Sequence, residues 1–235
     1  MLFWSILIVT TVISLVATLR VKAAIHHWSR VRAASGETGA ECARRILSAA
    51  GIHDVDIVPG NSFLGDHYDP IHKRLVLSPD HYRGSSVAAL GIAAHECGHA
   101  IQHKIAYKPL TWRMASVGAT TYANQLVTWL PLIFLFTGGF GHFRGVTATT
   151  YLLFMAGGWG VIMLFNLITL PVEFDASRRA VLILDKMNFL ADAEERAGVK
   201  KVLTTAGWTY VAAFITSLLY TLYYLLPLLL GNRRN

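Results

Sequence analysis

The sequence predicts a mainly α-helical membrane protein with four transmembrane helices and a small cytosolic α+β domain. Two observations lead to this class. Hydrophobic residues make up 54% of the 235 residues and charged residues only 15%, well below the ~25% that is usual in soluble domains. In addition, long stretches without any charged residue alternate with polar stretches, so the apolar residues are concentrated in a few segments.

Four uncharged stretches are long enough to cross a bilayer, which takes about 20 apolar residues in a helix, or as few as about 17. They predict an N-terminal anchor over 1–20 and transmembrane helices over 114–143, 145–172 and 202–232. No basic residue precedes the first stretch and no small-residue cleavage site follows it. We therefore interpret it as a retained anchor rather than a signal peptide.

The distribution of Lys and Arg predicts the orientation of these helices. Twelve of the 21 basic residues lie in 20–113 and six lie in 173–201, which leaves three for the opposite side of the membrane. By the positive-inside rule, the two richer segments face the cytosol and both termini lie outside. The net charge of +7 mostly reflects this topology, so it does not indicate binding to nucleic acid.

The predicted cytosolic region 21–113 carries both helix and strand patterns. An amphipathic helix is expected over 37–51, followed by short strands over 54–58 and 73–78. The second strand is a candidate edge that would pair with an extended peptide. A helix of roughly 18 residues is then expected after Ser85-Ser86, which offers an N-cap.

Several further residues have an expected structural role. Cys42 and Cys97 fall on the predicted cytosolic side, where thiols stay reduced, so we expect no disulfide. In the cytosolic segment 173–201, Asp192 and Glu195 have the spacing of a capping box.

The predicted membrane helices also contain polar and aromatic residues. Asn124, Gln125 and Asn166 are expected to form hydrogen bonds between helices. The aromatic run at 220–224 indicates a belt at the membrane interface.

The helix after Ser86 contains the stretch AAHECGHAIQH (93–103), whose H-E-x-x-H pattern arises by chance in about one chain in a hundred of this composition. His95 and His99 lie on one helix face, one turn apart, so a tetrahedral Zn²⁺ can take an imidazole nitrogen from each. Glu96 is offset by about 100°. There it can accept a proton from a zinc-activated water and pass it to the leaving amine. The pattern favours metal-assisted hydrolysis over an ordinary polar helix face.

A catalytic zinc needs a third protein ligand, and the spacing leaves more than one candidate. His103 continues the same face, but three ligands along one straight helix cannot converge on one metal. We interpret it instead as a cation at the helix C-terminus. Glu173 and Asp175 lie where the helix over 145–172 ends. Two predicted spans separate them from His99, so the chain returns to the same side of the membrane and either acid is permitted.

Four stretches together resemble the membrane-bound neutral zinc metallopeptidases, a bacterial family distantly similar to the integral-membrane gluzincins. They are HYDPIHKRLVLSPDHY (67–82), AAHECGHAIQH (93–103), LPVEFDASRRA (170–180) and VKKVLTTAGWTYVAA (199–213). The resemblance covers most of the chain from about 20 to 230. It implies a zincin-like cytosolic domain, with zinc held by His95, His99 and Glu173 and with Glu96 as catalytic acid and base.

The sequence departs from the wider gluzincin pattern at one position. Those proteins often read E-x-x-x-D, in which the Asp orients a ligand His, whereas position 177 here is Ser. Ser177 lies on the face of Glu173, so it is a candidate to support a ligand, although a neutral side chain does this less strongly. Asp175 shares a face with Arg178 and Arg179, where an ion pair is expected.

Three other residues are candidates for a role near the site. Arg178 is a candidate to neutralise charge there, and it also fits the basic flank of a membrane helix. His67 and Tyr68 are candidates to hold the substrate or its oxyanion, and they also fit an ordinary polar loop.

We therefore expect an integral zinc metalloprotease of the bacterial cell membrane, which hydrolyses peptide bonds of a protein or peptide at the cytosolic surface. An intramembrane protease would need the H-E-x-x-H on a full apolar span, which 84–108 lacks. A metal transporter would need ionisable ligands within the spans, where only His142 occurs. A non-catalytic zinc-binding scaffold or sensor is the alternative, but Glu96 would have no role in it. The oligomeric state is not specified.

Overall fold

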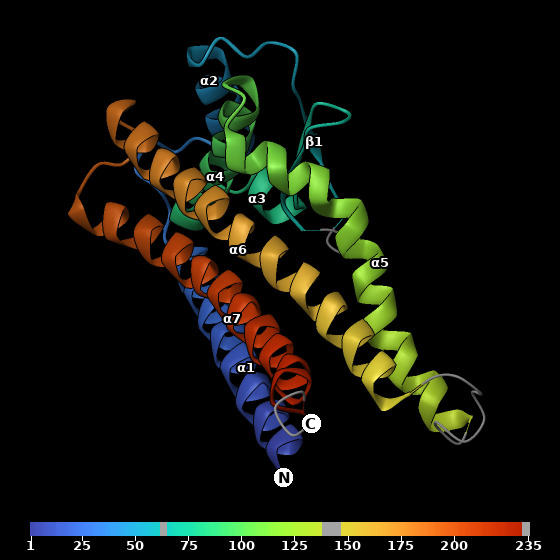
Figure 1. Ribbon diagram of the computed structural model, residues 1–235. Helices are drawn as coiled ribbons and strands as arrows, with labels where there is room; N and C mark the ends of the chain where they lie inside the picture. The colour runs from blue at the N-terminus through green and yellow to red at the C-terminus, as the bar shows by residue number, and fades with distance from the viewer. Residues whose placement is uncertain (62–64, 138–146, 232–235) are drawn as a thin grey trace. The chain divides into compact units, whose positions relative to one another are not determined.

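The computed structural model describes residues 1–61, 65–137 and 147–231 (Figure 1). The elements in chain order are α1 (Leu2–Trp28), α2 (Gly39–Ala49), β1 (Asp56–Pro59), β2 (His67–Asp69), β3 (Arg74–Leu77), α3 (Pro79–Arg83), α4 (Val87–Lys104), α5 (Lys108–Phe136), α6 (Ala148–Lys186) and α7 (Ala193–Gly231).

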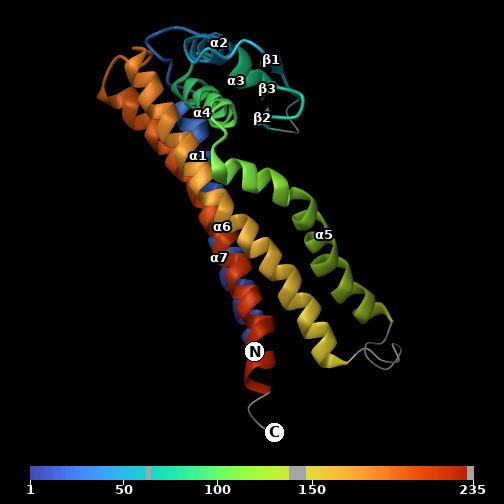
Figure 2. The same ribbon diagram turned by 45° about the horizontal axis from the view of Figure 1, so that its top comes forward.

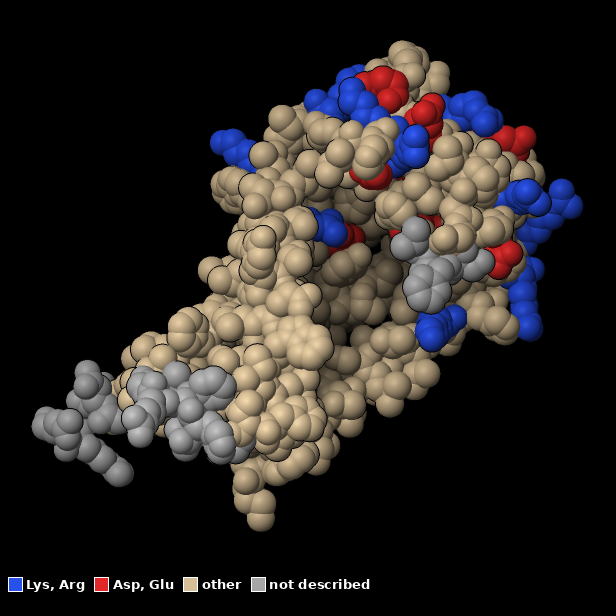
Figure 3. Space-filling view, turned by 90° about the vertical axis from the view of Figure 1, so that its right-hand side faces the viewer, with Lys and Arg blue, Asp and Glu red and all other residues tan. Residues whose placement is uncertain are grey.

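The chain divides into two compact units. The first, which we call the apolar unit, consists of Met1–Leu15, Trp112–Thr169 and Tyr210–Asn235. The second, the polar unit, consists of Val16–Thr111 and Leu170–Thr209. The described part of the apolar unit has one charged side chain, Arg113, whereas all 14 Asp and Glu residues belong to the polar unit. On the face seen in Figure 3, the charged side chains accordingly gather on one part of the surface.

The polar unit contains a three-stranded sheet in the order β1-β3-β2 (Figure 2). β1 pairs with β3 in parallel, and β2 pairs with β3 antiparallel. β3 is therefore the central strand, and the prediction that the strand over 73–78 is an edge is wrong. The edges are β1 and β2, and β2 contacts α4. With only three residues, β2 is too short to show an alternating pattern in the sequence.

Helix α4 is central to the polar unit and has the extent that the sequence predicts. Ser86 is its N-cap, and the Ser86 side chain accepts a hydrogen bond from the Ala89 amide. The buried residues of α4 join those of α2, β3, α6 and α7 in one apolar core. Its large members include Ile46, Leu75, Leu90, Leu184 and Phe189. Full burial of each such side chain contributes about 1.5–3 kcal/mol.

A buried carboxylate fixes the start of α7. The Asp192 side chain accepts a hydrogen bond from the Glu195 amide at 2.8 Å, as the predicted cap requires. The Glu195 carboxylate accepts hydrogen bonds from the amides of Ala191 at 2.9 Å and Ala34 at 2.6 Å. Glu195 therefore also ties α7 to the segment that follows α1, a long-range contact that spacing alone does not reveal.

Aromatic side chains pack the helices of the apolar unit together. Tyr220 stacks on Trp159 with ring centroids 4.5 Å apart, and Phe3 meets Tyr220 edge-on at 6.4 Å. Tyr220 and Tyr224 are buried in this packing. The prediction that 220–224 forms an interface belt is thus wrong for these two residues, because their rings fill space between helices.

The polar side chains of the apolar unit find partners in two ways. Asn166 donates hydrogen bonds to Ser217 Oγ and the Ala213 carbonyl on α7, so its predicted interhelical role is confirmed. Asn124 instead donates to the Thr120 carbonyl, one turn back on α5. Gln125 likewise accepts a hydrogen bond from Trp129 on α5, so for these two the prediction is wrong.

Within the described residues, three helices are long and apolar enough to cross a membrane: Leu2–Trp28, Ala148–Lys186 and Ala193–Leu230. The predicted helix over 114–143 is not among them. Part of it, 138–143, lies outside the described residues, and α5 over Lys108–Phe136 mixes an apolar second half with several amides and hydroxyls. The two long helices also continue past the predicted spans. α6 runs without a break from the uncharged stretch to Lys186, and α7 begins at Ala193.

A test of the polar unit concerns Asp66, which accepts hydrogen bonds from the Ser78 amide at 2.7 Å and from the His81 ring at 2.7 Å. Burial by itself would raise the pKa of the Asp66 carboxyl, but the bonds from His81 and Ser78 outweigh it, so the pKa lies below its ordinary value. The stability from this carboxylate is therefore present above the unfolded-state pKa of about 4 and is lost as the pH falls through the folded-state pKa. We expect Asp66→Asn to lower the free energy of unfolding by about 1–3 kcal/mol at neutral pH.

The difference between wild type and Asp66→Asn should shrink in acid, and thermal unfolding in detergent at a series of pH values measures it. A difference that stays constant from neutral to acidic pH would show that the charge of Asp66 does not stabilise the unit.

Candidate metal centre

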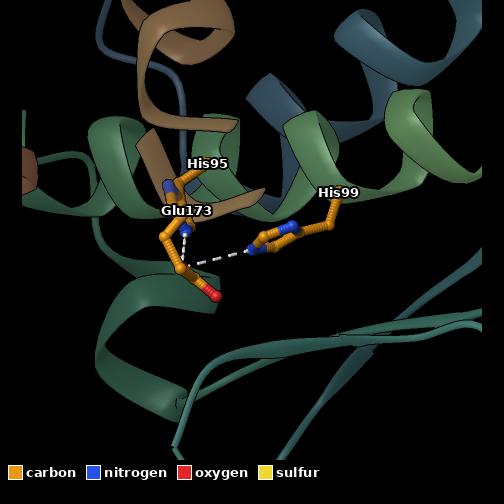
Figure 4. Close-up of side chains that lie close together, drawn as sticks. All are labelled: His95, His99 and Glu173. Carbon is orange, nitrogen blue, oxygen red and sulfur yellow. Dashed lines mark hydrogen bonds and ion pairs between the residues drawn. The ribbon is translucent and has the colours of Figure 1, made fainter. Parts of the chain in front are cut away.

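Two histidines and one glutamate converge in the polar unit. His95 and His99 come from consecutive turns of α4, and Glu173 comes from α6, 78 residues after His95. Their ligand atoms all lie within 4.8 Å of one another. Glu173 Oε2 is 3.3 Å from His95 Nε2 and 3.6 Å from His99 Nε2. Figure 4 shows both rings directed at the carboxylate. Among the described residues, no other cluster of His, Cys, Asp and Glu has this form.

The geometry of α4 explains how the two rings reach one point. Four residues advance the helix by slightly more than one turn, so the two side chains leave the same face. Their ring centroids are 4.8 Å apart and the ring planes are nearly perpendicular, at 86°. This edge-to-face arrangement lets both Nε2 atoms point at the same carboxylate.

The α4–α6 contact depends on a glycine. A Cβ atom on Gly98 would lie 2.8 Å from the carbonyl oxygen of Ala176, closer than the Cβ atoms of folded proteins come to other atoms. The backbones of α4 and α6 therefore meet directly at Gly98 and Ala176. Glu173 lies one turn before Ala176, so this close approach brings its short side chain within reach of both rings.

A chain of hydrogen bonds fixes the ring of His99. His99 Nδ1 is 3.0 Å from Gln102 Oε1, and Gln102 Nε2 donates to the Val172 carbonyl at 2.8 Å and to Asp175 Oδ2 at 3.0 Å. Because both of the latter groups are acceptors, the amide orientation is set, and Oε1 faces the ring. Nδ1 of His99 must then carry hydrogen, and Nε2 is left to bind a cation.

His95 has a neutral partner. Ser177 Oγ lies 3.1 Å from His95 Nδ1. A hydroxyl both donates and accepts, so it can take the Nδ1 hydrogen and leave Nε2 directed at Glu173. Ser177 follows Glu173 by one turn on α6, as the sequence spacing indicates.

The electrostatics of the cluster favour positive charge beside His99 Nε2. Burial alone would lower the pKa of His99, but the hydrogen bond with Glu173 and the nearby charge of Glu96 outweigh it and hold the pKa above its ordinary value. The donor set of two imidazole nitrogens and one carboxylate oxygen is the set that catalytic zinc takes in several hydrolases. The residues present therefore fit a zinc ion.

Glu96 is buried beside the cluster. It follows His95 directly and so leaves α4 about 100° from the face of the ligands. Among the described residues, none donates a hydrogen bond to its carboxylate, which is therefore available to accept a proton.

The other candidates from the sequence form hydrogen bonds with residues other than the three ligands. Arg178 is exposed and donates to Asp175 at 2.6 Å, and Arg179 donates to Asp175 at 2.5 Å, so the ion pair predicted for this acid is confirmed. Tyr68 Oη lies 2.9 Å from Nδ1 of His103 at the end of α4. His67, the neighbour of Tyr68 on β2, contacts the Gly65 carbonyl through Nδ1 at 3.3 Å.

Gln102 is the site residue that the sequence reasoning missed. It is fully buried, although an amide in the last turn of a helix ordinarily faces water. Its position three residues after His99 places it beside that ring, which is the signal that was available. The two cysteines take no part, because both are free and buried, and Cys97 contacts the Ala43 carbonyl.

Comparison with known proteins gives a match over nearly the whole chain. The family described as "Putative neutral zinc metallopeptidase" matches residues 3–229. "Putative membrane protease YugP" from Bacillus subtilis (strain 168) is 39% identical over 235 residues, which is 100% of each chain. No solved structure shows a significant match. The similarity therefore extends over the described parts of both units.

The hydrogen-bond chain predicts a graded effect on metal binding. Glu173→Ala removes a ligand oxygen and should abolish stoichiometric zinc binding, whereas Gln102→Leu leaves all three ligands but frees the His99 ring. Loss of such a partner typically weakens metal affinity about 10–100-fold. Arg178→Ala is the matched control, and we expect its zinc affinity to be close to that of the wild type, because Asp175 keeps its hydrogen bonds with Arg179 and Gln102. The measurements are zinc content and competition with a chelator, on protein shown to be folded in detergent. Wild-type affinity in Gln102→Leu would contradict the assigned role of the amide.

Proposed function

The chain belongs to the family of neutral zinc metallopeptidases, and we propose that it is a membrane metalloendopeptidase whose site is formed by His95, His99 and Glu173 with Glu96. The observation that carries the proposal is the convergence of two imidazole Nε2 atoms and one buried carboxylate from elements far apart in the sequence. A general base sits next to them on α4. Ordinary packing does not require this combination.

Each residue has a part in holding the metal. His95 and His99 offer Nε2, and Glu173 offers Oε2, while Ser177 and Gln102 hold the two rings through Nδ1. A zinc ion held by these three atoms would lower the pKa of a water molecule and polarise the scissile carbonyl. Among the described residues, three offer ligand atoms, the number that a catalytic zinc takes from its protein.

Glu96 moves the proton. Its carboxylate accepts a proton from the attacking water and returns it to the nitrogen of the leaving amine, which would otherwise depart as an unstable anion. The position of Glu96 supports this role, because it is buried beside the three ligands and comes directly after His95 on α4.

An extended peptide is the substrate that suits the surroundings of the site. β2 is an edge strand of the sheet and contacts α4, the helix that carries both histidines. No strand of the described residues pairs with the outer edge of β2, so its backbone groups can pair with a peptide strand that runs along α4. His67 and Tyr68 lie on β2, so they would contact the substrate rather than the metal.

We also propose four membrane spans, with the site on the cytosolic side of a bacterial cell membrane. α5 would be the additional span, and its polar groups support this because they are satisfied within the helix. Asn124 donates to the Thr120 carbonyl, and Trp129 donates to Gln125. Such pairing lowers the cost of placing these groups in lipid. The excess of Lys and Arg in 20–113 and 173–201 supports the orientation.

A non-catalytic zinc scaffold is the alternative function. It would use the same three ligands but would have no need of a general base. The buried Glu96 beside the ligands therefore favours turnover.

The role of Glu96 is tested by Glu96→Gln. We expect zinc content to match the wild type and the rate of peptide hydrolysis to fall by about 10²–10⁴-fold, the usual contribution of a positioned general base. Glu194→Gln, at an exposed position on α7, is the matched control with full activity. The readout is cleavage of a quenched fluorescent peptide library by detergent-purified protein. Full activity of Glu96→Gln would exclude the mechanism, and a wild type that binds zinc without cleaving would favour the scaffold.

The orientation is tested by single cysteines. His53→Cys lies at an exposed position of the polar unit and Thr147→Cys at the start of α6, while the native cysteines are buried and give little background. In intact cells a membrane-impermeant thiol reagent should label Thr147→Cys and spare His53→Cys, which should react after lysis. The reverse labelling pattern would place the site outside the cell.

A further inference from the structure

The polar unit contains a second feature, a cavity of about 1140 Å³ lined by the end of α1, the segment after it, α3 and the residues before α4. Six of its lining residues are basic: Lys22, His26, Arg30, Arg32, His81 and Arg83. Asp80 is the one acidic residue of the lining. None of these residues belongs to the metal centre.

The charge of the cavity is largely uncompensated. Lys22, Arg30, Arg32 and Arg83 are exposed, and none of them forms an ion pair with a carboxylate of the described residues. Other arginines of the polar unit do have such partners. Arg179 and Arg196, for example, lie within 2.7 Å of Asp175 and Asp185. Four cations gathered around one cavity repel each other unless an anion lies among them.

The backbone adds to this potential. Gly84, Ser85 and Ser86 line the cavity and lead directly into α4, a helix of 18 residues. The positive end of its dipole therefore lies beside the four cations.

The position of the cavity along α1 indicates the kind of anion. The uncharged part of this candidate span ends at Leu19, and the cavity begins at Lys22, less than one turn later. That is the level at which the headgroups of a bilayer lie, and basic residues directly after a span attract anionic lipids. Ile25 and Pro79 give the lining an apolar part, which suits the glycerol region of a lipid.

We propose that this cavity binds the phosphate headgroup of an anionic phospholipid. The cations after α1 and in α3 hold the phosphate oxygens, and a free phosphate ion offers the same oxygens without the glycerol and acyl part. Since the residues before α4 form one wall, the bound lipid also supports the helix that carries His95 and His99.

Ligand-dependent thermal stability of the full chain in neutral detergent tests the proposal. The probes are dioctanoyl phosphatidylglycerol, dioctanoyl phosphatidylcholine and inorganic phosphate, since a ligand that binds the folded state raises its unfolding temperature with concentration. We expect a saturable rise with phosphatidylglycerol only. Each cation near a lipid surface strengthens binding about fivefold. The loss of two cations in Arg30→Gln/Arg83→Gln should therefore weaken the apparent affinity for phosphatidylglycerol about 25-fold.

Two further variants keep the test decisive. Lys200→Gln/Lys201→Gln removes two exposed cations of α7 outside the cavity and should respond like the wild type. Arg30→Lys/Arg83→Lys keeps the charge and should retain most of the response. An equal rise with phosphatidylcholine, an equal rise with inorganic phosphate, or an equal loss in the Lys200→Gln/Lys201→Gln protein would each overturn the proposal.

Discussion

The burial of the Glu173 carboxylate is the constraint on which the metal centre depends. A carboxylate removed from water must be paired, because an isolated buried charge costs several kcal/mol. Glu173 is 3% exposed and faces the Nε2 atoms of His95 and His99, so the positions of all three are coupled. The close contact of α4 with α6 at Gly98, and the hydrogen bonds that hold each ring through Nδ1, follow from the need to complete this arrangement.

Features set by neighbours in the sequence could be predicted. The extent of α4 and its N-cap at Ser86 follow from local pattern and spacing. The ion pair of Asp175 with Arg178 and Arg179 also follows from helix periodicity, because all the partners lie on one turn of α6. The choice of Glu173 over Asp175 as the acid facing the histidines came from the family resemblance, and in the structure Glu173 is the acid that lies with them.

Features that depend on residues far apart in the sequence could not be predicted. Gln102 takes its role from Val172 and Asp175 on another helix, and no spacing along α4 encodes that contact. The order of the strands is likewise set by pairing between them. The sequence pattern therefore predicted the strand β3 correctly, but the prediction that it is an edge strand was wrong. Tyr220 resembles an interface residue until its stacking on Trp159 is known. In each case the local sequence pattern is present, but a contact with a residue far away in the sequence determines the role of the residue.

The two unspecified positions of the H-E-x-x-H pattern are not free in this protein. Cys97 is wholly buried and contacts the Ala43 carbonyl on α2, and Gly98 faces the backbone of α6, so packing restricts which residues both positions accept. We therefore expect positions 97 and 98, like the other three positions of the motif, to accept few substitutions. A pattern that allows any residue at either position would accept many sequences in which the third ligand could not approach the helix.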